Sequence, residues 1–219
     1  MKKFLLIFAA LTLGIVGGGC GKEDMPEDAL KDIQLAIANQ DRQLLESRVD
    51  SKKFLNDLYS NVTNEIADNI DKFHASYPDD PYFWNTPQFI RKYNEDHRLF
   101  YMSFVDASVN AYFDKETKAD NFLNIFAIQC AKEFKNICAA INTKSDAAII
   151  TGNYATINFR VTGDDTPYGQ FIGDLNFKFA FEKGEDKQWH LIKIENLNEL
   201  MPALVDKAEL VWPETMLNK

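Results

Sequence analysis

The sequence predicts an α+β fold in which N-terminal helices pack on one face of a C-terminal antiparallel β-meander. Apolar residues recur at helical spacing across residues 27–141, as in helices with one buried face. Residues 147–196 instead alternate apolar and polar side chains, which is the period of half-buried strands. Because the main helices precede the strands, we expect helices and sheet to form two layers of a single domain over residues 27–212.

Capping residues and prolines divide the helical half. Residues 27–38 form the first predicted amphipathic helix, and Asp41 is well placed to cap a short helical turn. Ser51 is expected to cap a longer helix that extends to about His74. The stretch that follows, residues 76–87, is dense in Pro, Asp and aromatic residues and is predicted to be a loop.

Two further helices are predicted after this loop. Thr86 and Pro87 supply a capping hydroxyl and a proline at the first helical position, so a helix is expected over residues 88–114. Apolar spacing predicts another helix over residues 120–141.

Three strong strands follow the helices. Alternation is clearest at residues 154–161, 175–181 and 188–196, with turn-rich segments between them. Short connections between these segments favour an antiparallel meander, and residues 147–151 can add a short strand. A closing helix is expected over residues 197–208, followed by a tail from Trp212.

The first 19 residues read as a signal peptide, and residues 20–26 as a tether. Lys2 and Lys3 give a basic start, an apolar run extends from Phe4 to Val16, and small residues precede Cys20. An apolar run of about 13 residues is too short for a permanent span of a bilayer core roughly 30 Å thick.

This arrangement resembles bacterial lipoprotein signals, in which the final cysteine is acylated and becomes the first residue of the mature protein. The resemblance implies lipidation of Cys20, for example with palmitate, and export to a membrane held through N-terminal acyl chains. Gly21 after the cysteine favours the periplasmic face of the outer membrane in a Gram-negative host. The family usually carries an aliphatic residue where this chain has Gly17, and small residues there also suit ordinary signal cleavage.

Composition excludes one class of partner. Without the signal peptide the chain keeps 22 of its 24 basic residues and all 33 acidic ones, a net charge of −11. Such a surface repels nucleic acid and anionic lipid headgroups, so no nucleic-acid partner is expected. Cys130 and Cys138 lie eight residues apart in a predicted helix, roughly 12 Å along its axis, which is too far for a disulfide.

No motif of an enzyme or cofactor site occurs. The chain has no Gly-rich phosphate loop, paired CxxC, HExxH or nucleophile elbow, and we expect no cofactor. Its three histidines, His74, His97 and His190, lack ligand spacing, so no metal site is expected.

His97 is the most interesting titratable residue. It shares a helical stripe with other members of a candidate pocket or contact site, namely Tyr93, Phe100 and Phe104. A histidine on an apolar face can act as a general base, but a buried histidine with one satisfied hydrogen bond is the favoured interpretation. Tyr82, Phe83 and Trp84 in the long loop can gate a pocket, contact a partner or pin the loop to the domain.

A second resemblance concerns the mature chain. Its first helices carry Ala38, Asp41, Leu45, Val49 and Asp50, which resemble the openings of uncharacterised exported bacterial proteins. The final hairpin, with Gly184 in an acidic turn before WHLIKIENL, is similar to that of nuclear-transport-factor-2-like domains. This resemblance implies a cone-like α+β fold, which ketosteroid isomerase and scytalone dehydratase also use. Residues 51–113 hold more helix than that family needs.

Three functions remain open at this point. The leading one is a non-catalytic binding or interaction module of the cell envelope, with a small apolar ligand, a peptide or another envelope protein as partner. The alternative is an isomerase- or hydratase-like enzyme with one buried acid or base in a cone cavity. A purely structural envelope component is the third.

Overall fold

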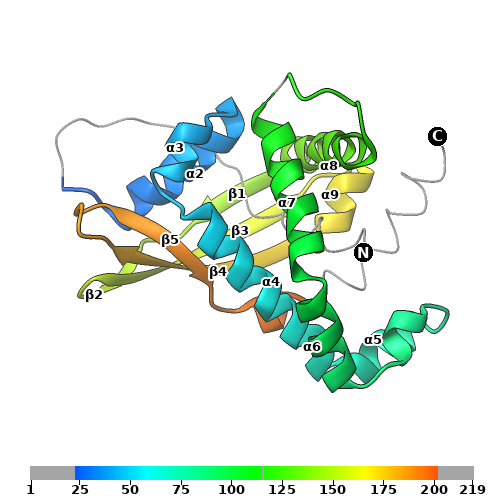
Figure 1. The fold of residues 1–219 in the computed structure, drawn as a ribbon. Helices are drawn as coiled ribbons and strands as arrows, with labels where there is room; N and C mark the ends of the chain where they lie inside the picture. Colours follow the sequence, from blue (N-terminus) through cyan, green and yellow to red (C-terminus); the bar gives the residue numbers. More distant parts are fainter. Residues whose placement is uncertain (1–22, 115, 202–219) are drawn as a thin grey trace.

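The computed structural model describes residues 23–114 and 116–201, and it has the α+β architecture predicted from the sequence (Figure 1). Helices occupy the N-terminal part of the described chain, and a five-stranded antiparallel sheet occupies the C-terminal part. The cone-like outline stays a prediction. No helix among the described residues is long and apolar enough to cross a membrane.

Within the described residues, four helices precede the long loop. They are α2 (Pro26–Asn39), α3 (Arg42–Glu46), α4 (Ser51–Asp68) and α5 (Ile70–Ser76). Asp41 caps α3 as predicted, because its carboxylate accepts the Leu44 N–H at 3.0 Å. The cap of α4 is Asp50 rather than Ser51, and the predicted single helix to His74 is interrupted at Asn69.

The second group of helices lies beyond this loop. It consists of the 3₁₀ turn η1 (Pro81–Trp84), α6 (Pro87–Asp96), α7 (Arg98–Phe113) and α8 (Phe122–Ala139). Thr86 caps α6, as predicted, by accepting the Phe89 N–H at 3.3 Å. The prediction of one continuous helix over 88–114 is wrong, because the helix is interrupted at His97. This residue is the C-cap of α6 and the N-cap of α7.

The C-terminal half contains two elements that were not predicted, one strand and one short helix. Its strands are β1 (Ile141–Ser145), β2 (Ile149–Thr151), β3 (Tyr154–Gly163), β4 (Asp174–Lys183) and β5 (Trp189–Ile194). The order is β1-β3-β4-β5, with β2 also paired to β3, so the predicted meander is confirmed. β1 begins where the preceding helix was expected to end, and α9 (Pro167–Ile172) lies within the segment predicted to be a turn.

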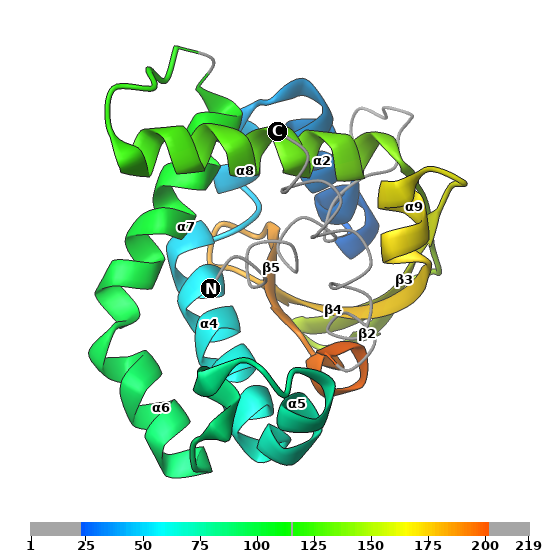
Figure 2. The same ribbon diagram turned by 90° about the vertical axis from the view of Figure 1, so that its right-hand side faces the viewer.

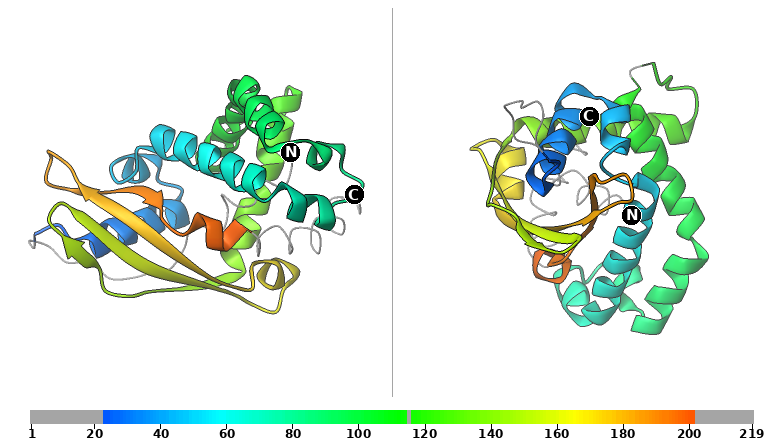
Figure 3. Two further views of the ribbon diagram at one scale, coloured as in Figure 1. Left: turned by 90° about the horizontal axis from the view of Figure 1, so that it is seen from below. Right: turned by 90° about the vertical axis from the view of Figure 1, so that its left-hand side faces the viewer.

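The core lies between one face of the sheet and the helices. Rings from β3 and β4 meet on this face, where Phe159 is paired with Phe177 and Ile157 with Phe179. Helices α2 and α4 contact β5, and α9 contacts β3. Figures 2 and 3 show the helices gathered around one side of the curved sheet.

The described chain ends in the core. Residues 197–201 are helical, in agreement with the start of the predicted closing helix, and Leu197, Leu200 and Met201 are buried. The rest of that predicted helix and the tail from Trp212 lie outside the described residues, as do Cys20 and the signal peptide.

Candidate functional site: an apolar cavity and an aromatic row

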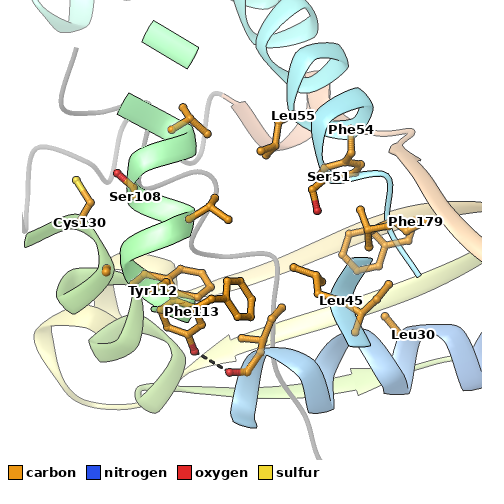
Figure 4. A pocket seen from close by; sticks show the side chains of 18 residues that line it. Leu30, Leu45, Ser51, Phe54, Leu55, Ser108, Tyr112, Phe113, Cys130 and Phe179 are labelled. Carbon is orange, nitrogen blue, oxygen red and sulfur yellow. Dashed lines mark hydrogen bonds between the residues drawn. The ribbon is translucent and has the colours of Figure 1, made fainter. Parts of the chain in front are cut away.

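A cavity of about 150 Å³ lies between the helices and the sheet. Helices α2, α3, α4, α7 and α8 supply its walls, and Phe179 of β4 and Leu191 of β5 contribute from the sheet (Figure 4). The lining residues are Leu30, Ile33, Ile37, Leu45, Val49, Ser51, Phe54, Leu55, Val105, Ser108, Val109, Tyr112, Phe113, Cys130, Ala131, Phe134, Phe179 and Leu191.

The wall from α2 follows directly from the predicted helix. Leu30, Ile33 and Ile37 lie at i, i+3 and i+7, so they share one face and point to the sheet. All three are buried. The opposite wall comes from α7, where Val105, Ser108 and Tyr112 follow the same spacing.

The polar atoms of the lining are mostly engaged within the protein. The Tyr112 hydroxyl donates to the Ile37 carbonyl at 2.8 Å, and the Ser108 hydroxyl donates to the Phe104 carbonyl at 2.7 Å. Burial raises the pKa of Tyr112 above its ordinary value. The Gln40 side-chain amide donates to the Tyr112 carbonyl, so two hydrogen bonds join the end of α7 to the end of α2.

The chemistry of this lining is that of an apolar binding site. None of the described lining residues is Asp, Glu, His, Lys or Arg. Apolar cavities of about 150 Å³ stay dry and accept a molecule the size of benzene. The site therefore suits one apolar group, such as a ring or the end of an acyl chain.

The structure places His97 outside this cavity. Its side chain is exposed, so the expectation of a buried histidine is wrong. The imidazole stacks on Tyr93 with centroids 4.2 Å apart, and its Nδ1 lies 2.8 Å from the Tyr93 carbonyl oxygen. Tyr93 in turn stacks on Phe89 at 5.7 Å.

Ring contacts continue along α7 to α8 through Tyr101, whose centroid lies 6.3 Å from that of His97 and 5.6 Å from that of Phe100. Phe100 meets Phe104 edge to face at 4.9 Å, and Phe104 meets Phe122 at 6.3 Å. We call the six residues of this surface the aromatic row: Phe89, Tyr93, His97, Phe100, Phe104 and Phe122. Phe89 is 45%, Phe100 51% and Phe122 74% exposed. The predicted site residues Tyr93, His97, Phe100 and Phe104 thus come together, but on the outer surface.

The loop aromatics adjoin the aromatic row at one point, where the Tyr82 ring meets Tyr93 edge to face with centroids 5.8 Å apart. Phe83 is buried between Phe73 and Tyr77, with centroid distances of 5.3 and 5.5 Å. The Tyr82 hydroxyl donates to Asn94 Oδ1 at 3.0 Å, and burial raises its pKa to about 12. Trp84 is exposed, although its indole N–H donates to the Pro78 carbonyl at 2.7 Å. These contacts pin the loop to the domain, and none of the three residues lines the cavity.

The cavity residues were missed because each is ordinary for its helix. Apolar side chains at i, i+3 and i+7 predict burial but do not tell a filled interface from one that leaves space. Of the two described cysteines, Cys130 lines the cavity and Cys138 is buried, and no disulfide links them. Among the described residues, no group of three His, Cys, Asp or Glu side chains is placed to hold a metal ion.

Comparison with family models, with curated proteins and with solved structures found no match for this chain.

Proposed function

We propose that this protein is an exported, membrane-anchored binding module of the cell envelope that holds an apolar group of its ligand in the cavity. The observation that supports this function is the cavity lining, which is apolar and has no charged side chain among its described residues. Burying an apolar group there removes it from water, at about 25 cal/mol per Å² of surface. Ligands with an exposed ring or acyl chain fit this description.

The lining also weighs against the alternative of an isomerase- or hydratase-like enzyme. Such chemistry needs a group that transfers protons near the working pH. The titratable groups of the lining are Tyr112 and Cys130, and the Tyr112 hydroxyl already donates to a backbone carbonyl. Because burial raises the pKa of Tyr112, its hydroxyl stays protonated at neutral pH and offers no phenolate to take up a proton.

The anchoring part of the proposal rests on Cys20. Acyl chains on this residue would hold the domain at a membrane, on the periplasmic face of the outer membrane if the host is Gram-negative. Cys20→Ser should abolish incorporation of labelled fatty acid and release the domain or leave an unprocessed precursor. A wild-type protein that takes up no label and is found free contradicts the anchor.

Ligand binding is tested with two small probes, benzene and octanoate. If either probe enters the cavity, it should raise the melting temperature of the full chain. At a probe concentration of 100 times its Kd, the gain in unfolding free energy is about 2.7 kcal/mol. Ala131→Leu places a larger side chain in the lining and should remove this shift. Ala139→Leu, on the exposed end of the same helix, should keep it. Equal shifts in both variants would show that the probes bind elsewhere.

A second candidate function, contact with another protein, is favoured by the aromatic row. Exposed rings of this kind are enriched in protein interfaces. A second copy of the chain is the partner that can be tested directly, by sedimentation velocity of the Cys20→Ser form at rising concentration. The double variant Phe100→Ser, Phe122→Ser should then lower any association. The buried Phe83 is not changed in this variant.

A further inference from the structure

The described part of the tether, from Glu23 onward, is held at one end of the sheet. Glu23 pairs with the Lys183 ammonium at 2.9 Å. Asp24 accepts the Trp189 N–H at 2.8 Å and also binds the guanidinium of Arg48, at 2.8 and 2.9 Å. Trp189 and Arg48 are buried, so these contacts belong to the domain itself. The chain therefore joins the domain beside the turn between β4 and β5.

The turn between β2 and β3 lies at the same end. The Lys183 N–H donates to the Asn153 carbonyl at 2.8 Å, which joins this turn to the end of β4. Glu27, in the first turn of α2, accepts the Ala148 N–H at 2.7 Å. Figure 1 shows both turns and the first described residues at the same edge of the molecule.

Exposed aliphatic side chains gather at this end, and we call them the tether corner: Met25, Ile149 and Ile150. Ile149 is 67% and Ile150 43% exposed. Successive side chains of a strand point to opposite faces, so the sheet is uncovered on both sides at β2. The other large exposed apolar residues of the described chain lie on η1, α6, α7 and α8, on the opposite side of the molecule in Figure 1: Trp84, Phe89, Leu99, Phe100, Phe122 and Ile125.

Chain length ties the tether corner to the anchor. Glu23 is the third residue after Cys20, so three Cα–Cα steps join the two. Since a residue spans at most about 3.6 Å, an acylated Cys20 lies no more than about 11 Å from Glu23 in any conformation. Acyl chains enter the hydrocarbon layer, so their cysteine lies at its surface. The tether corner is therefore the apolar surface that a short tether brings nearest to the lipids.

We infer that the tether corner is a membrane-contact site, which inserts Met25, Ile149 and Ile150 among phospholipid headgroups and turns the aromatic row away from the bilayer. This inference rests on the proposed acylation of Cys20. The neighbouring turn between β4 and β5 carries two carboxylates, Glu185 and Asp186, against one ammonium, Lys187, so zwitterionic lipids are favoured over anionic ones.

The test uses the full-length acylated protein in phosphatidylcholine vesicles. A photoreactive residue, p-benzoylphenylalanine, replaces Ile149 in one variant and Leu99 in a matched control. Both positions are exposed, and Leu99 lies at the start of α7, 87% exposed. After illumination, mass spectrometry measures the protein–lipid adducts. We expect at least tenfold more lipid adduct at position 149 than at position 99.

Flotation of the same samples separates failure of the anchor from failure of the inference. If the protein does not float with the vesicles, the acylation is at fault, and the contact site falls with it. If the protein floats but the adducts at the two positions are equal, or position 99 gives more, the orientation is wrong. A protein–protein adduct at position 149 would overturn the inference in favour of edge pairing between two copies at β2. Position 150 replaces position 149 if the first variant fails to fold.

Discussion

The phenylalanines of the sheet and those of the outer helices have opposite environments. Phe159, Phe177, Phe179 and Phe181 on β3 and β4 are at most 1% exposed, whereas Phe89, Phe100 and Phe122 of the aromatic row on α6, α7 and α8 are 45%, 51% and 74% exposed. A strand has two faces, and one of them must face the covering helices. A helix can pack on its neighbours through any of several lengthwise faces. The face with the most aromatic residues is not always the one that is buried.

The buried face of α6 and α7 shows what replaced the aromatic stripe. Ile90, Met102 and Val105 are buried there, together with the polar residues Asn94 and Ser108. Asn94 Nδ2 donates to Thr63 Oγ1 at 3.2 Å, and its Oδ1 accepts the Tyr82 hydroxyl. Polar side chains that have hydrogen-bond partners can occupy a buried helix face. Polarity alone therefore predicted the wrong buried face for α6 and α7.

The largest difference between the two regions is expected on truncation of one ring in each. Phe177→Ala removes a fully buried ring that stacks on Phe179 at 5.7 Å, and it should cost about 3–5 kcal/mol. Phe100→Ala removes a half-exposed ring and should cost less than about 1 kcal/mol. Urea unfolding of both variants measures the difference. Similar losses would mean that the aromatic row is buried in solution.

A second, smaller effect is expected at the polar residue that α6 buries. Asn94→Ala leaves the hydroxyls of Tyr82 and Thr63 without this partner, at a cost of about 1–3 kcal/mol. Gln88→Ala on the exposed side of the same helix is the control and should change the unfolding free energy by about 0.5 kcal/mol or less. Equal losses would place Asn94 outside the core.

Sequence reasoning predicted the sheet better than the helices. The alternation of β3 and β4 predicted which side chains are buried, because one sheet face is covered. On β5 the predicted alternation is interrupted: a register shift at Ala180/Phe181 places Ile194 opposite Phe179, in the core. Nothing in local periodicity signals such a bulge.

The candidate site was predicted only in part. The stacking of Tyr93, His97, Phe100 and Phe104 into one surface follows from spacings of three and four residues. Their exposure depends on which stripe of α6 and α7 packs on α4 and α8, which is a tertiary property. The cavity depends on contacts between Tyr112 of α7 and Ile37 of α2, 75 residues apart in the chain. Short-range patterns do not contain that contact.

A third prediction compares one tyrosine from each region at alkaline pH. Burial, as the largest cause, raises the pKa of both Tyr82 and Tyr154 to about 12, and a hydrogen bond to Glu195 also raises that of Tyr154. In the unfolded chain a tyrosine ionises at about pH 10. The stability that these two tyrosines contribute is therefore fully present below about pH 10 and is lost as the pH rises to about 12. Absorbance at 295 nm should show both tyrosines ionising late. Glu195→Gln should lower the pKa of Tyr154 and leave Tyr82 unchanged.

The smallest change in unfolding free energy is expected on replacement of His97. A buried and an exposed histidine predict different values for this change. A buried histidine would lose about 1–3 kcal/mol on replacement by Gln, through imperfect hydrogen bonding. The exposed His97 makes one local bond to the Tyr93 carbonyl and one ring stack, so His97→Gln should change the unfolding free energy by less than about 1 kcal/mol. A loss of about 2 kcal/mol or more would contradict the exposed position of His97. Since His97→Gln is expected to leave stability nearly unchanged, only an activity assay tests a general-base role of His97. If the variant folds normally but its turnover of a substrate falls by a factor of about 10² to 10⁴, the non-catalytic proposal is wrong.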